Sequence, residues 1–198
     1  MDFALRANLR LFKFVPNEFV RVLPAKNAGS PGMTRKKALV KSANKIHIRP
    51  AHAGDDEFVL SLVERFVDFE LPRWRKRSDC ASGIRRDLKR ALDELPASEN
   101  LFVAEGESGE RLGFLRVQKT RDFFSGRANC HISDLVVARG CEGRGVGRAL
   151  LAHAQAWAKQ QRCTLITLAV FPGNTRAREL YGRAGFAEDL LRLAKQVK

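Results

Sequence analysis

The sequence lacks the features that mark several common classes of protein. It contains four cysteines, but no CxxC pair and no nearby histidine at a spacing that would suggest a zinc site. No apolar run approaches the roughly 20 residues that a membrane-spanning helix needs. Neither a G-x-G-x-x-G turn with an acidic residue on the next strand nor a G-K-[ST] turn is present. We therefore expect no metal site, no membrane segment, no nucleotide site of these two kinds, and free thiols in a reducing cytoplasm.

Acidic residues are scarce relative to basic ones, 22 against 36, which gives a formal net charge of +14. Half of this excess lies in residues 1–44, which hold nine Lys or Arg and two acidic residues. Residues 24–42 are rich in Gly, Pro, Ser, Ala and Lys, and the whole segment has no clear apolar period. We therefore predict a basic, poorly ordered extension and linker over residues 1–44 and one folded domain over residues 45–198.

The extension has other interpretations. Its Arg-rich, acid-poor start resembles an organellar transit peptide, and the same pattern arises from a start codon assigned too far upstream, with Met33 as the true start. An arm that binds nucleic acid or a membrane would use the positive charge directly. We favour a solvated tail, so binding of nucleic acid is not the expected function.

Residues 132–151 predict a strand, a glycine-rich turn and a helix. An apolar, β-branched run reaches Val137, the chain breaks at Gly140, and the sequence GRGVG of residues 143–147 opens a helical pattern. Glycine at every second position lets the backbone approach a ligand and turn its N–H groups outward. The helix adds about half a positive charge at its N-terminus. The turn is a candidate anion site that suits a pyrophosphate, although a tight turn without a ligand would have the same residues.

A second motif follows about thirty residues later. An apolar run over residues 165–171 and a Pro-Gly turn lead to NTRARELYGRAGF, residues 174–186. Asn174 can cap a helix there, apolar residues recur on one face, and Gly185 is placed to end the helix. This motif contains Tyr181, the only tyrosine of the chain.

The two motifs, in this order and at this separation, resemble the GNAT superfamily of acyl-CoA-dependent N-acyltransferases over about residues 45–198. The cofactor turn of that family begins with Gln or Arg, and here Glu142 stands at that position. The resemblance implies an α/β fold, a mixed central sheet of six or seven strands flanked by helices on both faces. It also implies acetyl-CoA as co-substrate, held mainly by backbone N–H groups of the turn.

Local patterns predict the elements of this sheet. Strands are expected over residues 45–49, 101–105, 111–119, 131–138, 165–171 and 189–197. The last of these would close the sheet, and a turn at residues 106–109 would make the second and third a hairpin. Helices are expected over residues 55–67 and 84–95, after the glycine turn, and from residue 174. The basic loop of residues 70–77 would bind an acidic acceptor or the 3′-phosphate of the cofactor, or stay solvated with Trp74 in the core.

The resemblance also implies roles for individual residues. Tyr181 corresponds to a phenol that lies near the thioester sulfur in relatives, so it would act as the acid for the departing thiolate. A backbone N–H near residues 135–137 would stabilise the oxyanion. Asp134 and Glu105 are candidate general bases on central strands, and a solvated carboxylate is the rival interpretation of each. The expected cofactor-binding residues are Leu135, Val136, Val137, Glu142, Gly143, Arg144, Gly145, Val146, Gly147, Arg148, Asn174 and Tyr181.

These observations predict a cytoplasmic N-acetyltransferase that transfers the acetyl group of acetyl-CoA to a primary amine by direct attack in a ternary complex, with no metal. The acceptor, a small molecule or a protein, carries no motif, and a homodimer is suggested only by analogy. The alternative function is a non-catalytic module that senses acyl-CoA or binds nucleic acid through the extension and residues 73–77. Steeply salt-dependent binding of nucleic acid would favour this alternative.

Overall fold

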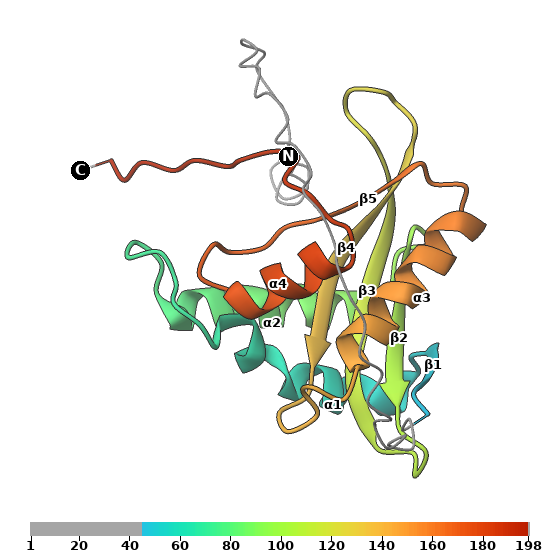
Figure 1. Cartoon of the computed structure of the whole chain (residues 1–198). Helices are drawn as coiled ribbons and strands as arrows, with labels where there is room; N and C mark the ends of the chain where they lie inside the picture. Colours follow the sequence, from blue (N-terminus) through green and yellow to red (C-terminus); the bar gives the residue numbers. More distant parts are fainter. Residues whose placement is uncertain (1–44, 198) are drawn as a thin grey trace, which may run out of the picture. The chain divides into compact units, whose positions relative to one another are not determined.

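The computed structural model describes residues 45–197, so the predicted extension over residues 1–44 lies outside the described residues. The described chain is a mixed α/β domain with one five-stranded sheet, in which the strands lie side by side in sequence order. Helices cover both faces of this sheet (Figure 1). The predicted fold class is therefore confirmed, whereas the expected six or seven strands are not.

The sheet combines an antiparallel meander with one parallel strand. The strands are β1 (His47–Pro50), β2 (Glu99–Glu105), β3 (Arg111–Arg121), β4 (Ala128–Val137) and β5 (Leu165–Leu168). The first four are antiparallel neighbours, and β5 runs parallel to β4. The predicted hairpin between β2 and β3 is confirmed, with Gly109 at a φ of 79° in its turn. The parallel step requires a crossover, which the helix after β4 provides.

Each face of the sheet has its own helical layer. α3 (Val146–Gln160) and α4 (Thr175–Arg183) lie on one face. α1 (Asp56–Ser61), α2 (Arg77–Asp93) and the 3₁₀ helices η1 (Ala53–Asp55) and η2 (Val63–Val67) form the other layer. Strand alternation divides the core accordingly: Phe102 and Leu115 belong to the cluster under α3, and Val103 and Phe114 to the cluster under α2.

The predicted bounds of several elements differ from the structure. The first predicted helix is split after Ser61, and the chain continues as the 3₁₀ helix η2. The hydroxyl of Ser61 donates to the Phe58 carbonyl at 2.7 Å at this break. The second helix begins at Arg77, seven residues earlier than predicted, and ends before Pro96 as expected. β5 ends at Leu168 rather than at residue 171.

The predicted last strand over residues 189–197 is wrong, because the structure gives this segment no strand pairing. Its apolar side chains are exposed, with Leu193 at 91% and Val197 at 89%. An alternating apolar pattern produces a strand only when a neighbouring strand satisfies its backbone N–H and C=O groups. In the described chain the free edge of β5 therefore remains the edge of the sheet.

Candidate functional site

The glycine turn after β4 has the geometry of an anion site. Gly140, Gly143 and Gly145 have φ values of 79°, 75° and 88°, which side-chain-bearing residues rarely adopt. A Cβ atom built at any of the three would meet no atom of residues 45–197 within 4 Å, so the described residues leave the space beside the turn open. Gly145 is the N-cap of α3, and within the described part of the chain this helix end has no side-chain cap. The N–H groups of its first turn are therefore available to an anion.

The side chain of Glu142 is bound away from the open space beside the turn. Its carboxylate is ion-paired with the guanidinium of Arg65 in η2, lies 3.6 Å from that of Arg176 in α4, and accepts from the Gly140 N–H at 2.7 Å. Although partial burial opposes it, the backbone hydrogen bonds and the two arginines hold the pKa of Glu142 below its ordinary value. Glu142, which replaces the Gln or Arg of the family pattern, therefore connects the glycine turn to both helical layers.

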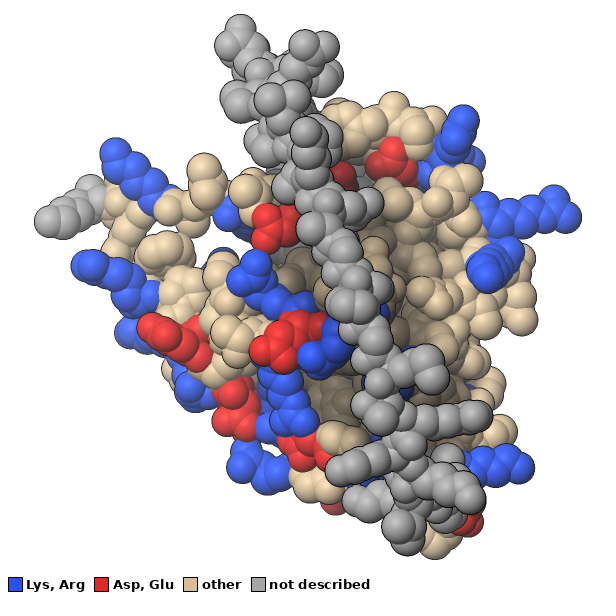
Figure 2. Space-filling view, viewed as in Figure 1, with Lys and Arg blue, Asp and Glu red and all other residues tan. Residues whose placement is uncertain are grey.

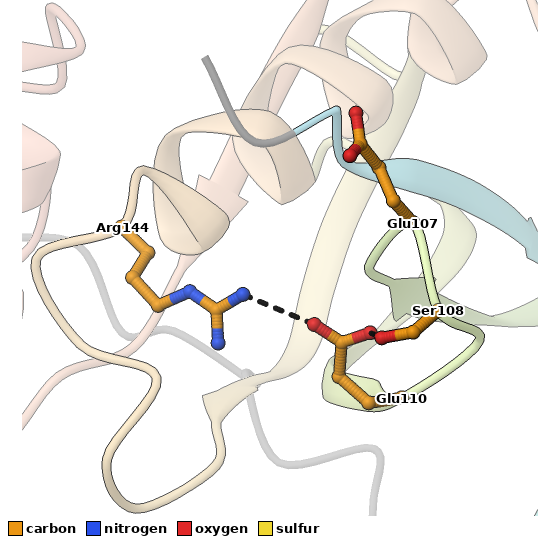
Figure 3. Close-up of a pocket in the computed structure, with 4 residues that line it drawn as sticks. All are labelled: Glu107, Ser108, Glu110 and Arg144. Atoms are coloured by element: carbon orange, nitrogen blue, oxygen red, sulfur yellow. Dashed lines mark hydrogen bonds and ion pairs between the residues drawn. The ribbon is translucent and has the colours of Figure 1, made fainter. Parts of the chain in front are cut away.

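The side chain of Arg144 reaches to the β2–β3 turn. It donates to Glu110 at 3.1 Å across a small polar hollow lined also by Glu107 and Ser108 (Figure 3). Hydrogen bonds from Ser108 and Arg144 lower the pKa of Glu110 to about 2. Arg144 therefore tethers the glycine turn to the hairpin, and the backbone of the turn remains the part that faces the open space.

β4 presents a free edge that leads from the glycine turn toward β5. The pairing of β4 with β5 ends at Ile132 and Leu168, while β4 continues to Val137 and the chain after β5 turns away toward α4 (Figure 1). The Ala138 N–H donates to Leu112 on β3, so alternation directs the N–H groups of Val137 and Leu135 to the opposite edge. The roles predicted for these groups, as oxyanion donor and as contact of the pantetheine arm, stay predictions.

Tyr181 lies on α4 beside this edge. Its ring packs against Phe186 with ring centroids 5.9 Å apart, and it belongs to the partly buried residues over the α3 face of the core. Burial and, second, the charge of Asp134 raise the pKa of Tyr181. Asn174 caps α4 by accepting the Ala177 N–H at 3.2 Å. The structure thus brings Tyr181 near Asp134, and it gives Asn174 the structural role that the sequence also allowed.

Asp134 belongs to a buried ionic cluster on the α2 face of the sheet. Arg116 on β3 donates from Nε to Asp134 at 2.5 Å, is ion-paired with Asp87 of α2, and lies 3.5 Å from Glu99 of β2. Arg116 and Asp134 are 3% and 8% exposed. Burial raises the pKa of Asp134, although the guanidinium of Arg116 opposes this rise. We define these four residues together with Arg90, which binds Asp87, as the Arg116 cluster.

Glu105 lies in a different part of the sheet. It accepts from Arg49 on β1, and Arg49 also binds Asp55 of η1 at 2.7 Å. Glu105 is opposite Arg111 on β3, whereas Asp134 is opposite Arg116, five residues further along that strand. At about 3.4 Å per residue the two predicted bases are therefore roughly 17 Å apart along the sheet, and the structure does not bring them together.

The basic loop of residues 70–77 lies against the turn before α4. A Cβ on Gly173 would meet the Glu70 carbonyl oxygen at 2.2 Å, and the guanidinium of Arg75 lies 5.6 Å from the centre of the Phe171 ring. Trp74 is 45% exposed, so the interpretation that placed it in the core is not supported. The loop therefore forms a wall next to the end of α4 that carries Asn174.

Two arginines of the site were missed at the level of sequence. Arg65 fell within the apolar period of a predicted helix, and Arg116 within a predicted strand. Only Arg116 had a local signal, because it shares a strand face with the apolar Phe114 and is thus expected to be buried. Glu142 lies 77 residues from Arg65 and Asp134 lies 18 residues from Arg116, and a local sequence pattern does not report pairs at such separations.

The described surface carries both signs of charge. Figure 2 shows carboxylates interspersed among the Lys and Arg side chains on the face viewed in Figure 1. Exposed pairs such as Arg178 with Glu188, 3.0 Å apart, contribute to this mixture. No helix of the described residues is both long and apolar enough to cross a membrane. Within the same residues, no group of three or more His, Cys, Asp or Glu side chains could hold a metal ion.

The fold and the site define an α/β protein in which a glycine turn and an open strand edge meet between two helical layers. Residues 64–186 match the Acetyltransferase (GNAT) family, and the chain belongs to this family. It is 28% identical over 144 residues to YhfO, an uncharacterized N-acetyltransferase of Bacillus subtilis, which covers 73% of this chain and 91% of YhfO. The recognition made from the two motifs is therefore confirmed.

Further relatives carry more specific names. A streptothricin acetyltransferase of Streptomyces lavendulae is 34% identical over 91 residues, covering 46% of each chain. An aminoglycoside N(6')-acetyltransferase of Stenotrophomonas maltophilia is 30% identical over 114 residues, covering 54% of this chain and 74% of the relative. Among solved structures, a putative acetyl transferase from Pyrococcus furiosus superposes with a TM-score of 0.63 at 24% identity, covering 77% of this chain and all of that one. This structural similarity supports the assignment of the fold.

Proposed function

We propose that this chain transfers the acetyl group of acetyl-CoA to a primary amine of a small molecule, in a ternary complex. The observation that carries the proposal is the free edge of β4, which connects the uncapped N-terminus of α3 with Tyr181. The glycine turn would hold the pyrophosphate, and the N–H groups of Leu135 and Val137 would pair with the pantetheine arm. The open space beside Gly143 and Gly145 fits this assignment.

The protein groups at this edge suit the chemistry of acyl transfer. Acetyl-CoA supplies an acyl carbon that the thioester activates toward an amine. The Leu135 N–H would stabilise the oxyanion, because it points to the open edge of β4. Tyr181 keeps its proton at neutral pH, since its pKa is raised, and its hydroxyl would donate to the sulfur as negative charge develops there. Of the two candidate bases, only Asp134 lies near Tyr181.

The acceptor class is inferred from two independent observations. Two relatives are named for streptothricin and aminoglycosides, which are small molecules that carry amines. The Arg116 cluster places the buried carboxylates of Glu99 and Asp134 on the α2 face of the sheet, where they would attract an ammonium group. We therefore propose a small, cationic primary amine. A cytoplasmic location and a homodimer remain part of the proposal, the former on the basis of four free cysteines.

The first test is isothermal titration of the full chain with acetyl-CoA, together with Gly145→Glu. This substitution puts bulk and a carboxylate at the proposed pyrophosphate site, so binding should fall below detection. Gly126→Glu is the matched control, because Gly126 also has a positive φ, 65°, and open space around it, in the loop between β3 and β4. It should bind acetyl-CoA like the wild type.

Acetyl transfer is then measured by mass spectrometry with neamine, streptothricin, spermidine and a short peptide as acceptors. Acetylation of one of the first two at a primary amine is the expected result. Absence of acetyl-CoA binding by the wild type would contradict the proposed function as a whole. Binding without transfer to any acceptor would favour the acyl-CoA-sensing alternative.

A further inference from the structure

We infer that His131 on β4 is a further catalytic residue, whose Nε2 takes the proton from the acceptor nitrogen during acetyl transfer. The inference rests on the proposed function. It arises from three features of the described residues: the register of β4, the hydrogen bond that orients the imidazole, and the charge balance of the Arg116 cluster. None of the predicted site residues included this histidine.

The register of β4 places His131 beside the candidate acceptor site. β3 pairs Val117 with Ile132 and Arg116 with Asp134, so Ser133 is an extra residue that forms a β-bulge. Without the bulge, His131 and Asp134 would lie on opposite faces, because they are three positions apart. With it, both lie on the α2 face, opposite Gln118 and Arg116.

His131 also lies at the inner end of the gap between β4 and β5. It pairs with Thr167, one position before the pairing of these strands ends at Ile132 and Leu168. The free edge that begins beyond this point carries Leu135, the proposed oxyanion donor. A thioester held at that donor would therefore be within a few residues of the imidazole, with an acceptor approaching from the α2 face.

The imidazole is oriented by one of its nitrogens. Nδ1 lies 3.0 Å from the hydroxyl of Thr167, which also accepts from the amide of Asn129 at 3.0 Å. Among residues 45–197 no hydrogen-bond partner is found for Nε2 of this partly buried ring. If Nδ1 carries the proton and donates it to Thr167, Nε2 has a free lone pair. This is the form that a general base requires.

The surrounding charges favour a neutral imidazole before the reaction. Burial and, second, the charge of Arg116 lower the pKa of His131, so the ring is unprotonated at neutral pH. The acidic groups nearby, Asp87, Glu99 and Asp134, are all bound to Arg116. Arg90 is the second cation of the cluster, so three carboxylates face two guanidiniums. Burial and the charge of Arg116 thus keep Nε2 unprotonated and able to accept a proton, and an imidazolium formed in the reaction would pass that proton on readily.

The proposed step balances in atoms and charge. The lone pair of the neutral amine forms a bond to the thioester carbon, and the carbonyl electrons move to the oxygen beside the Leu135 N–H. The ammonium nitrogen of this tetrahedral species gives one proton to Nε2 of His131. The carbonyl then re-forms as the C–S bond breaks, and the thiolate takes a proton from Tyr181. His131 releases its proton to water, and Tyr181 regains one from water.

The inference is tested first on the wild-type protein, without any acceptor. Nitrogen-15 NMR of the imidazoles, assigned through bonds to the backbone of the wild-type protein, measures the tautomer and the titration of His131 from pH 4 to pH 8. A ring protonated at Nδ1 that titrates below pH 6.5 is the expected result. Protonation at Nε2, or titration above pH 6.5, would overturn the base assignment even if the variant failed to fold.

The second test compares pH profiles of kcat/KM for acetylation of the acceptor found in the amine panel. Wild-type activity should fall at low pH as His131 becomes protonated, in addition to the dependence contributed by the amine itself. His131→Gln can keep a hydrogen bond to Thr167 but cannot titrate, so this low-pH limb should disappear and kcat should fall about 10²-fold. His47→Gln is the matched control, because His47 is exposed on the far edge strand β1.

The affinity for acetyl-CoA separates this inference from the proposed function. His131→Gln should bind acetyl-CoA as tightly as the wild type, since the glycine turn is unchanged. If His131→Gln retains wild-type activity and pH profile while Asp134→Asn loses the low-pH limb, the proton goes to Asp134 and the inference is wrong. Activity restored to His131→Gly by added imidazole would support it, because a merely structural role would not respond to a free base.

Discussion

Glu142 is the residue at which this chain departs most clearly from the pattern of its family. A negative group at the start of a pyrophosphate turn should weaken binding, yet the structure places it between Arg65 and Arg176. The Glu142 carboxylate thereby keeps the guanidiniums of Arg65 and Arg176 close to the glycine turn. The affinity of the turn for a pyrophosphate would therefore depend on two opposing contributions: repulsion by Glu142 and attraction by the two arginines.

We predict that Glu142→Gln binds acetyl-CoA about threefold to tenfold more tightly, because it removes one negative charge and releases Arg176 and one side of the Arg65 guanidinium, which stays paired with Asp68. Isothermal titration at two salt concentrations measures this change, which should shrink at high salt. The control is Glu188→Gln, which removes an exposed carboxylate bound to Arg178. Weaker binding by Glu142→Gln would mean that Glu142 positions the arginines rather than competing for them.

Tyr181→Phe tests the hydroxyl at the other end of the strand edge. The substitution keeps the ring that packs on Phe186, so acetyl-CoA affinity should stay within about twofold, while kcat falls about 10²-fold. Because the raised pKa keeps the phenol protonated, wild-type activity should not decline between pH 7 and pH 9. Steady-state kinetics across this range measures both effects. An unchanged kcat at every pH would show that the thiolate leaves without this group.

At the scale of single elements, sequence predicted what local chemistry determines. The glycine turn, the cap at Asn174 and the β2–β3 hairpin depend on a few adjacent residues, and all three are present. The last strand and the length of β5 were wrong, because they depend on whether a distant edge is available. The bulge at Ser133 also had no local signal, since it is defined only by the register with β3.

Deletion of Ser133 should remove the bulge while preserving which face each side chain occupies. Ile132 and Asp134 would then be adjacent, and they already point to opposite faces. We expect acetyl-CoA affinity to fall about tenfold or more, because the bulge increases the local bend that separates β4 from β5. Calorimetric titration, with circular dichroism to verify folding, measures this. Unchanged affinity in a folded variant would show that the early end of β5 suffices to open the gap.

At the scale of the whole molecule, the site is assembled from segments far apart in sequence. The motif residues of the glycine turn and α4 could be predicted because each motif is continuous. The partners of Arg65, Arg116 and His131 could not be predicted, because they follow from the packing of η2, the register of β3 and the pairing of β5. The sequence thus predicts the glycine turn and the start of α4, whereas the ionic contacts around them depend on the folded arrangement.

A second ionic cluster stabilises the other edge of the sheet, at β1. Arg49 of β1 donates to Asp55 of η1 and to Glu105 of β2, and Arg111 of β3 lies 3.0 Å from Asp55. Asp55 is fully buried and also accepts the His52 N–H at 3.0 Å. This group connects three strands to the start of the helical layer, so its charge state should affect the stability of the whole domain.

Asp55 should make stability depend on pH. The hydrogen bond from Arg49 is the main cause that lowers the pKa of Asp55 from 3.8 to about 2. Because the folded-state pKa lies below the unfolded value, the stabilisation is present above about pH 4 and is lost as the pH falls toward 2. A shift of this size corresponds to about 2 kcal/mol at neutral pH. Urea unfolding of the wild type and Asp55→Asn at pH 6, 4 and 3 measures it. The difference in unfolding free energy should be largest at pH 6 and shrink toward pH 3, whereas a constant difference would mean that the hydrogen bonds act without the charge.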